Sequence, residues 1–221
     1  MKAPRLLCFF LLLVYGVLSA AAQDDLTEVF NFPLSRENLA RYNAICAILA
    51  EHPVVAGIFT QTRTLSRQGR SLVSRGNFII AAKLGMVWDT QAPFPSTMAV
   101  GRDYIIQSTP RGTRTRLEAR GNETFLRLSD TISAVFSGDA RKLRENFENY
   151  FVESGGNWIL GLVPTDRAIR NFAARIIMSG DSVIRIIILR EQNGDTIRYE
   201  LADHDFPGAL SPHEEALFSL D

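Results

Sequence analysis

The sequence predicts a mainly β protein with some helix (α+β), built around a curved antiparallel sheet. Short apolar stretches joined by tight turns fill residues 54–109. A second series occupies residues 150–201, and its turns contain Gly-Gly, Ser-Gly-Asp and Asn-Gly. Several of these stretches are apolar on both faces, which is typical of a sheet that wraps around something.

The first 22 residues have the pattern of a secretory signal peptide. Lys2 and Arg5 precede an apolar run from Leu6 to Leu18, and small residues follow up to Ala20-Ala21-Ala22. This run is shorter than the roughly 20 residues that a membrane-spanning helix needs. We therefore expect residues 1–22 to be removed on export and residues 23–221 to form a single domain.

Composition and charge narrow the classes of function. The chain has 24 basic and 24 acidic residues, and loss of Lys2 and Arg5 with the signal would leave a net charge of −2. This balance does not favour nucleic-acid binding. Loss of the signal also leaves Cys46 without a partner for an internal disulfide.

No catalytic or metal-binding motif stands out. The sequence has no Gly-x-Ser-x-Gly run, phosphate loop or paired-carboxylate pattern, so we expect neither an enzyme nor a cofactor. The histidines, His52, His204 and His213, are too scattered to predict a metal site.

The first expected element after the signal is a helix from Ser35 to about His52. Its apolar residues recur at three- and four-residue spacing, and Pro53 ends the pattern. Strands should follow at Val54–Leu65, Leu72–Ala82, Gly85–Thr90 and Thr97–Thr109, with a turn at Gly101-Arg102-Asp103 inside the last.

The apolar period becomes helical in the middle of the chain. One short helix is expected from Asp130 to Ser137, with Gly138 as its cap, and a second begins at Asp139. Their apolar residues are Ile132, Val135, Phe136, Leu143 and Phe147. These helices could cover one mouth of a curved sheet, or they could be ordinary connectors packed in the core.

Strands then resume, and a helix closes the chain. The strands are expected at Tyr150–Glu153, Asn157–Val163, Asn171–Met178, Val183–Arg190 and Asp195–Leu201. The final hairpin turns at Asn193-Gly194. Ser211 and Glu214 can form a capping box around Pro212, which predicts a short C-terminal helix.

Alternation along the strands assigns their apolar faces. Trp158, Leu160 and Leu162 share one face, Ile184 and Ile186 share another, and Met86 lies on the same face as Trp88. Two interpretations remain open. Aromatic and β-branched residues at this period usually form a packed sheet core, but they could also line an open cavity for a lipid.

The order of several short motifs is distinctive. The first half contains Gly57-Ile58-Phe59-Thr60-Gln61, Gly76-Asn77-Phe78, Trp88 and Pro93-Phe94-Pro95-Ser96-Thr97. The second half contains Phe136-Ser137-Gly138-Asp139, Leu143, Phe147, Trp158 with Leu160, Leu162 and Pro164, and then Asn193-Gly194. This order, over residues 35–202, resembles the LolA family of outer-membrane lipoprotein carriers.

The resemblance implies an unclosed, strongly curved antiparallel β-barrel with a hydrophobic cavity covered by short helices. It implies a monomeric periplasmic carrier that takes an acylated lipoprotein, or other lipid cargo, from an inner-membrane transporter to an outer-membrane acceptor. The expected lipid-binding lining is Phe59, Phe78, Met86, Trp88, Met98, Trp158, Leu160, Leu162, Ile184 and Ile186. The expected lid residues are Ile132, Val135, Phe136, Leu143 and Phe147.

One position departs from the family pattern. Lipoprotein carriers of the family usually have an Arg-Pro pair on the turn after the strand of Gly76, and this Arg helps to hold the lid; here the pair reads Ala82-Lys83. A lysine ammonium lacks the planar fork of a guanidinium. The Pro93–Thr97 run also looks more like divergent members thought to serve other lipids. The alternatives are therefore a carrier of a glycolipid or aryl-polyene lipid, or a sensor or binding module for lipidated envelope components that transports nothing.

Overall fold

The computed structural model describes residues 26–118, 126, 130 and 133–219. The expected signal peptide, residues 1–22, lies outside these residues, and so does the expected lid residue Ile132. Within the described part of the chain, no helix combines the length and hydrophobicity that crossing a membrane requires.

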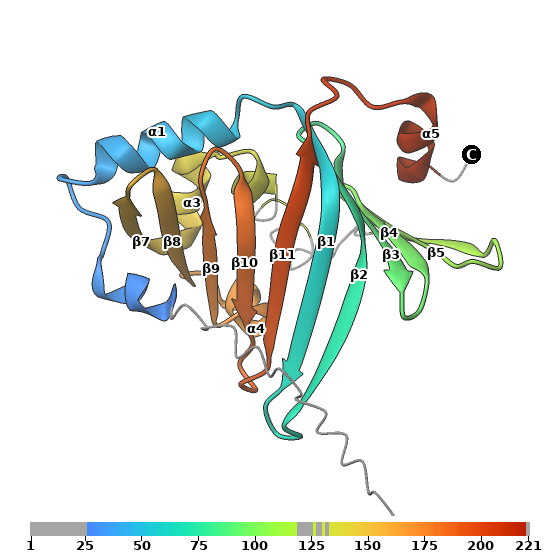
Figure 1. Ribbon diagram of the computed structural model, residues 1–221, viewed down its shortest axis with the longest axis horizontal. Helices are drawn as coiled ribbons and strands as arrows, with labels where there is room; N and C mark the ends of the chain where they lie inside the picture. The colour runs from blue at the N-terminus through green and yellow to red at the C-terminus, as the bar shows by residue number, and fades with distance from the viewer. Residues whose placement is uncertain (1–25, 119–125, 127–129, 131–132, 220–221) are drawn as a thin grey trace, which may run out of the picture.

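A single antiparallel sheet dominates the fold (Figure 1). Its strands are β1 Val54–Leu65, β2 Arg70–Ala81, β3 Gly85–Ala92, β4 Ser96–Val100, β5 Tyr104–Ser108, β6 Arg114–Glu118, β7 Phe147–Ser154, β8 Asn157–Pro164, β9 Arg175–Gly180, β10 Ile184–Arg190 and β11 Thr196–Asp205. Their order is β6-β5-β4-β3-β2-β1-β11-β10-β9-β8-β7. Since β6 and β7 stand at opposite ends, the sheet is curved but unclosed, which confirms the predicted fold class.

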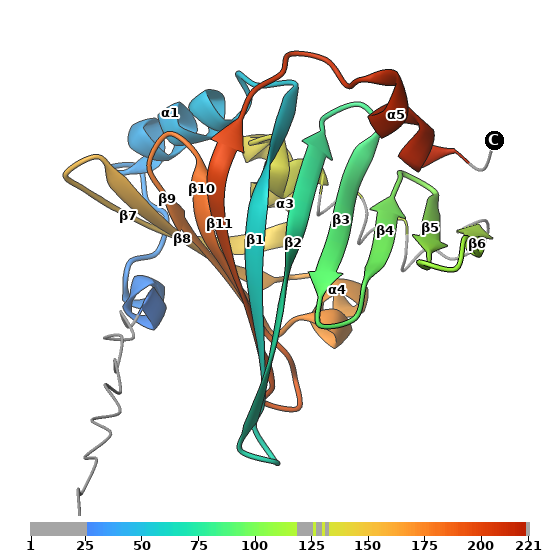
Figure 2. The same cartoon turned by 45° about the vertical axis from the view of Figure 1, so that its right-hand side comes forward.

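Short helices cover the sheet. They are the 3-10 helix η1 Leu26–Asn31, α1 Leu39–Leu49, α3 Ala140–Asn146, α4 Arg167–Phe172, α5 Pro212–Glu215 and the 3-10 helix η2 Ala216–Phe218. Figure 2 shows α3 and α4 on one side of the sheet and α5 near its β3–β5 end. Residues 133–136 are also helical. We call the face that contacts α1, α3 and residues 134–136 the inner face, and the opposite one the outer face.

Both faces are apolar because both are covered. On the outer face, Phe218 of η2 packs with Val87 and Ile106, while Val29 of η1 packs with Ile177 at the other end. The inner face carries the largest cluster of buried residues, to which most strands and the helices contribute. The strands are therefore apolar on both faces because each face of the sheet packs against other elements.

Most predicted elements are confirmed, and some need correction. Strand β1 has the predicted bounds, and the C-terminal capping box is present between Ser211 and Glu214. The strand predicted from Asn171 is wrong at its start, because α4 occupies this segment and β9 begins at Arg175. The Asp166 carboxylate accepts a hydrogen bond from the Ile169 backbone amide at 3.3 Å, which favours a helical turn there. Sequence patterns also missed β6.

Candidate functional site

The inner face gathers most of the predicted lining residues. Seven of the ten belong to one buried cluster, each 8% exposed or less: Phe59, Phe78, Trp88, Trp158, Leu160, Leu162 and Ile184. The strands bring them together because side chains at period two share a face. At the rim of the cluster, the Trp158 indole Nε1 donates a hydrogen bond to the Asp181 carbonyl oxygen at 2.6 Å.

Aromatic rings form the centre of this cluster. The Trp88 ring stacks on Phe59 with centroids 5.3 Å apart, and it also meets Phe78 at 5.8 Å and Tyr199 at 5.4 Å. Burial raises the pKa of the Tyr199 phenol above its usual value of 10.0. The phenol is therefore neutral, and the centre of the inner face offers an apolar surface.

Helix α1, residues 133–136 and α3 close over these rings. Tyr42 and Cys46 of α1 are buried in the cluster with Val135 and Leu143. The Tyr42 hydroxyl donates to Asn149 Oδ1 at 2.9 Å, and Asn149 Nδ2 donates to the carbonyls of Leu143 and Phe147. One buried amide on β7 thus ties α1 and α3 to the sheet; sequence patterns gave no signal for Asn149.

The described lid residues have different positions. Val135 and Leu143 are buried as expected, and Phe136 is partly buried beside them. Phe147 is a correction: it is the first residue of β7 and does not belong to a helix, since its backbone is extended with φ −138° and ψ 149°. It nevertheless packs in the same inner cluster.

Gly138 allows residues 133–136, which we call the lid segment, to approach α1 closely. Its φ of +60° is in the left-handed region, and a Cβ at this position would lie 2.1 Å from the Cys46 carbonyl oxygen. Any other residue would force the two segments apart. The glycine after residues 133–136 is therefore required by packing as well as by backbone conformation.

Ile186 is a second correction, because it lies on the outer face. The register between β9 and β10 shifts between Ile184 and Ile186, so a β-bulge reverses the alternation at this point. Ile184 remains in the inner cluster, whereas Ile186 packs beside the η1 cluster around Val29. A bulge of this kind cannot be read from a run of alternating apolar residues.

The inner face continues past the helices. Met98 on β4 is the direct partner of Trp88 and therefore lies on the same face, yet it is 39% exposed. Farther along, Leu117 on β6 is opposite Ile105 and is 59% exposed. A covered apolar surface and a partly uncovered one thus adjoin on the same side of the sheet.

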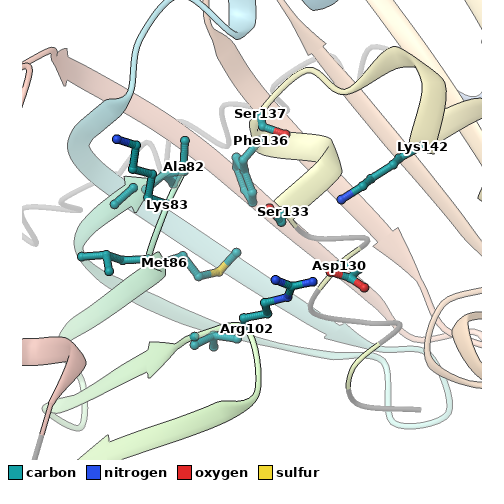
Figure 3. Close-up of a pocket in the computed structure, with 15 residues that line it drawn as sticks. Ala82, Lys83, Met86, Arg102, Asp130, Ser133, Phe136, Ser137 and Lys142 are labelled. Carbon is teal, nitrogen blue, oxygen red and sulfur yellow. The ribbon is translucent and has the colours of Figure 1, made fainter. Parts of the chain in front are cut away.

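A cavity lies between the β2–β3 turn and the lid segment (Figure 3). Its volume is about 240 Å³, and it is lined by Ile80, Ala81, Ala82, Lys83, Leu84, Gly85, Met86, Val100, Gly101, Arg102, Asp130, Ser133, Phe136, Ser137 and Lys142. Met86 is thus at the predicted lining, although outside the buried cluster. Ala82 and Lys83, the pair that differs from the family pattern, form part of the cavity wall together with Ser133, Phe136 and Ser137.

A smaller space of about 30 Å³ lies beside this cavity, against Phe78, Ile80 and His204. Pockets for drug-sized ligands have volumes of about 300–1,000 Å³. Neither space reaches that size. No cluster of metal-ligating side chains occurs among the described residues.

Comparisons with known proteins find matches among solved structures. Neither a protein-family profile nor a curated protein matches this chain. Among solved structures, it is similar to a LolA superfamily protein from Nitrosomonas europaea, with 10% identity, coverage of 80% of this chain and 97% of that chain, and a TM-score of 0.45.

Two further structures show the range of this likeness. A DUF1329 family protein from Desulfovibrio piger has 7% identity, coverage of 81% of this chain and 95% of that chain, and a TM-score of 0.45. A chain of the Pseudomonas aeruginosa MucA/MucB complex has 11% identity, coverage of 78% and 59%, and a TM-score of 0.38. At these identities the likeness concerns the fold alone.

Proposed function

We propose that this protein binds the acyl chains of a lipid or lipoprotein on the inner face of its sheet and carries them through the periplasm, from the inner to the outer membrane. The observation that supports this most directly is the continuity of the inner face. Trp88 in the covered cluster and Met98 on the uncovered part are cross-strand neighbours. A chain bound at Met98 could therefore extend toward Trp88 without crossing a polar barrier.

The energetic need for such a carrier follows from the cost of exposing acyl chains. Each methylene in water costs about 0.8 kcal/mol, so a sixteen-carbon chain loses on the order of 12 kcal/mol when it leaves a membrane unshielded. An apolar surface offsets this loss without directional bonds and accepts chains of different length. The flexible thioethers of Met86 and Met98 suit this role.

Release of the cargo requires that binding be reversible. In the structure, Tyr42, Val135 and Leu143 occupy the inner face where an acyl chain would lie. Cargo would have to displace them, so the free energy of lid packing would be subtracted from the affinity for cargo. A lid of this kind would keep the apolar centre out of water between loading and unloading.

A carrier of a free lipid is the second candidate. It is favoured by Ala82-Lys83 at the wall of the cavity, because the arginine expected to hold the lid of a lipoprotein carrier is replaced there. A sensor of lipidated envelope components would use the same inner face but would deliver nothing. Transfer between membranes is the property that separates these roles.

Native mass spectrometry of the protein purified from its own envelope tests the proposal. Copurified acylated protein supports a lipoprotein carrier, and a bound glycolipid or polyene supports the free-lipid carrier. Transfer of that cargo between donor and acceptor vesicles, dependent on this protein, would distinguish a carrier from a sensor. Protein that stays empty when purified and when offered lipid vesicles would contradict the proposal.

A further inference from the structure

We propose that the headgroup of the cargo is anionic, a carboxylate or phosphate of a lipid, and that Arg102 and Lys142 hold it in the 240 Å³ cavity. This inference rests on the proposed function, because it names the class of lipid that the inner face would carry. It concerns the polar end of the cargo, whereas the proposed function concerns the acyl chains.

The cavity has two chemically different sides. Ile80, Met86 and Phe136 supply apolar atoms, while Arg102 and Lys142 point their charged groups into the same space (Figure 3). Met86 lies two residues before Trp88 on β3, so both side chains are on the inner face. A lipid with its headgroup in the cavity could therefore continue along the inner face toward Trp88 and Met98.

The charges around the cavity favour an anion. Three lining residues are cationic, Lys83, Arg102 and Lys142, and only Asp130 is anionic. Among the described residues, none of these three cations takes part in an ion pair. Elsewhere some arginines are paired, as Arg185 is with Asp181 at 2.8 Å. Unpaired cations beside an apolar wall match the two ends of an anionic amphiphile.

Asp130 is the one lining residue whose charge opposes an anionic headgroup. It lines the same cavity as Arg102 and Lys142 (Figure 3), and among the described residues it forms no ion pair with either cation. Asp130 is helical and lies three residues before Ser133, the first of the helical residues 133–136. An incoming anionic headgroup would be attracted by the two cations and repelled by this carboxylate.

The test uses the full-length exported protein and two single-chain lipids with the same palmitoyl chain: the anionic lysophosphatidylglycerol and the uncharged monopalmitoylglycerol, which has no phosphate. Dissociation constants are measured by quenching of tryptophan fluorescence below the micelle concentration. We expect the anionic lipid to bind at least ten-fold more tightly. Arg102→Gln and Lys142→Gln should each weaken binding of the anionic lipid about ten-fold, as expected for a hydrogen bond to a charged group, and leave binding of the uncharged lipid unchanged.

Two control variants sharpen the result. Arg70→Gln removes the same charge at the opposite end of β2, where Arg70 pairs with Leu65 beside the β1–β2 turn, and should change neither affinity. Asp130→Asn removes the carboxylate that repels an anionic headgroup and should tighten binding of the anionic lipid. Thermal unfolding checks that each variant stays folded. The side chain of Arg102 is exposed, so its replacement should not disturb the fold.

The possible outcomes separate the two proposals. Binding of both lipids with equal affinity, unaffected by Arg102→Gln and Lys142→Gln, would overturn the headgroup assignment and leave the lipid-binding function standing. Failure of both lipids to bind would overturn both. Inorganic phosphate should compete only weakly because it lacks the acyl chain; competition as strong as that of the anionic lipid would show a phosphate site and would contradict a lipid headgroup.

Discussion

Phe59 and Trp88 stack with their ring planes only 11° apart, although they come from β1 and β3, with β2 between them. The residue opposite Phe59 on β2 is Gly76, which has no side chain to separate the two rings. The glycine of the Gly76-Asn77-Phe78 motif thus explains how an aromatic centre forms across three strands. This centre contributes to stability whether or not a lipid binds next to it.

Replacement of Trp88 by alanine should therefore destabilise the protein. Trp88 is 8% exposed and contacts three other rings, so we expect Trp88→Ala to lower the free energy of unfolding by about 3–5 kcal/mol. Urea unfolding followed by circular dichroism measures this. Phe94→Ala is the matched control, because Phe94 is 82% exposed and its removal should change stability by less than about 0.5 kcal/mol. Equal effects would show that Trp88 is not in a packed centre.

The exposed part of the inner face can be tested without disturbing this centre. Met98→Glu places a charge at the proposed entrance for acyl chains and should reduce lipid binding at least ten-fold while the protein stays folded. Ile58→Glu is the control, since Ile58 is 44% exposed but is adjacent to Phe59 in β1 and so faces outward. Binding of a fluorescent fatty acid compares the two. Equal loss in both variants would remove the distinction between the faces.

The hydrogen bond between Tyr42 and Asn149 should hold the lid. Tyr42→Phe removes the hydroxyl and leaves the buried Asn149 Oδ1 without this donor, which should cost about 1–3 kcal/mol of stability. Because a looser lid competes less with cargo, the affinity for lipid should rise. Tyr150→Phe serves as the control, since its hydroxyl contacts only the exposed Glu148 at 3.3 Å. A Tyr42→Phe variant that is less stable but binds lipid no better would separate lid packing from cargo binding.

Gly138 should be intolerant of any side chain. Gly138→Ala brings a Cβ within 2.1 Å of the Cys46 carbonyl oxygen and so should lift the segment after residue 133 from α1. Gly112→Ala is a close control: its φ is also positive, at +80°, but nothing lies within 4 Å of the added atom. Hydrogen exchange of the α1 amides should accelerate in Gly138→Ala and stay unchanged in Gly112→Ala. Protection that is equal in both would contradict the close packing of these segments.

His204 should make stability depend on pH. Burial lowers its pKa below the ordinary value of 6.5, and its Nε2 lies 3.0 Å from the Ile184 carbonyl oxygen. Because the unfolded chain binds the proton more readily, the folded protein should lose stability as the pH falls below about 6.5. His204→Gln should flatten this part of the profile of unfolding midpoint against pH, whereas His213→Gln, at an exposed position, should not. An unchanged slope in His204→Gln would rule His204 out as the source.

Local patterns predicted the elements well where nothing interrupts them. The bounds of β1 follow from turn residues and a continuous apolar run, and the last helix follows from its capping box. The face of Ile186 could not be predicted, because one extra residue in a bulge reverses every later side chain. Phe147 has helical spacing from Leu143, yet the pairing of Phe147 with Pro164 in the sheet determines its conformation.

The residues of the candidate site were likewise predictable only in part. Strand alternation placed Trp88, Trp158 and Leu160 together because each lies on a regular strand. Arg102 and Lys142 belong to a turn and a helix that lie far apart in the chain, and only the fold brings them to one cavity. Asn149 likewise gives no periodic signal, since a single buried amide is recognised only by its partners.

The gap between β6 and β7 gives the protein a way to change its width. β6 pairs with β5, and β7 pairs with β8 and, on its other edge, with residues 32–34. Because β6 and β7 do not pair with each other, the two ends of the sheet can move apart while every hydrogen bond between adjacent strands stays intact. Added twist would then be shared in small amounts over all the strands. A guest of greater girth could be admitted by elastic bending of the whole sheet, with no need to unfold any part of it.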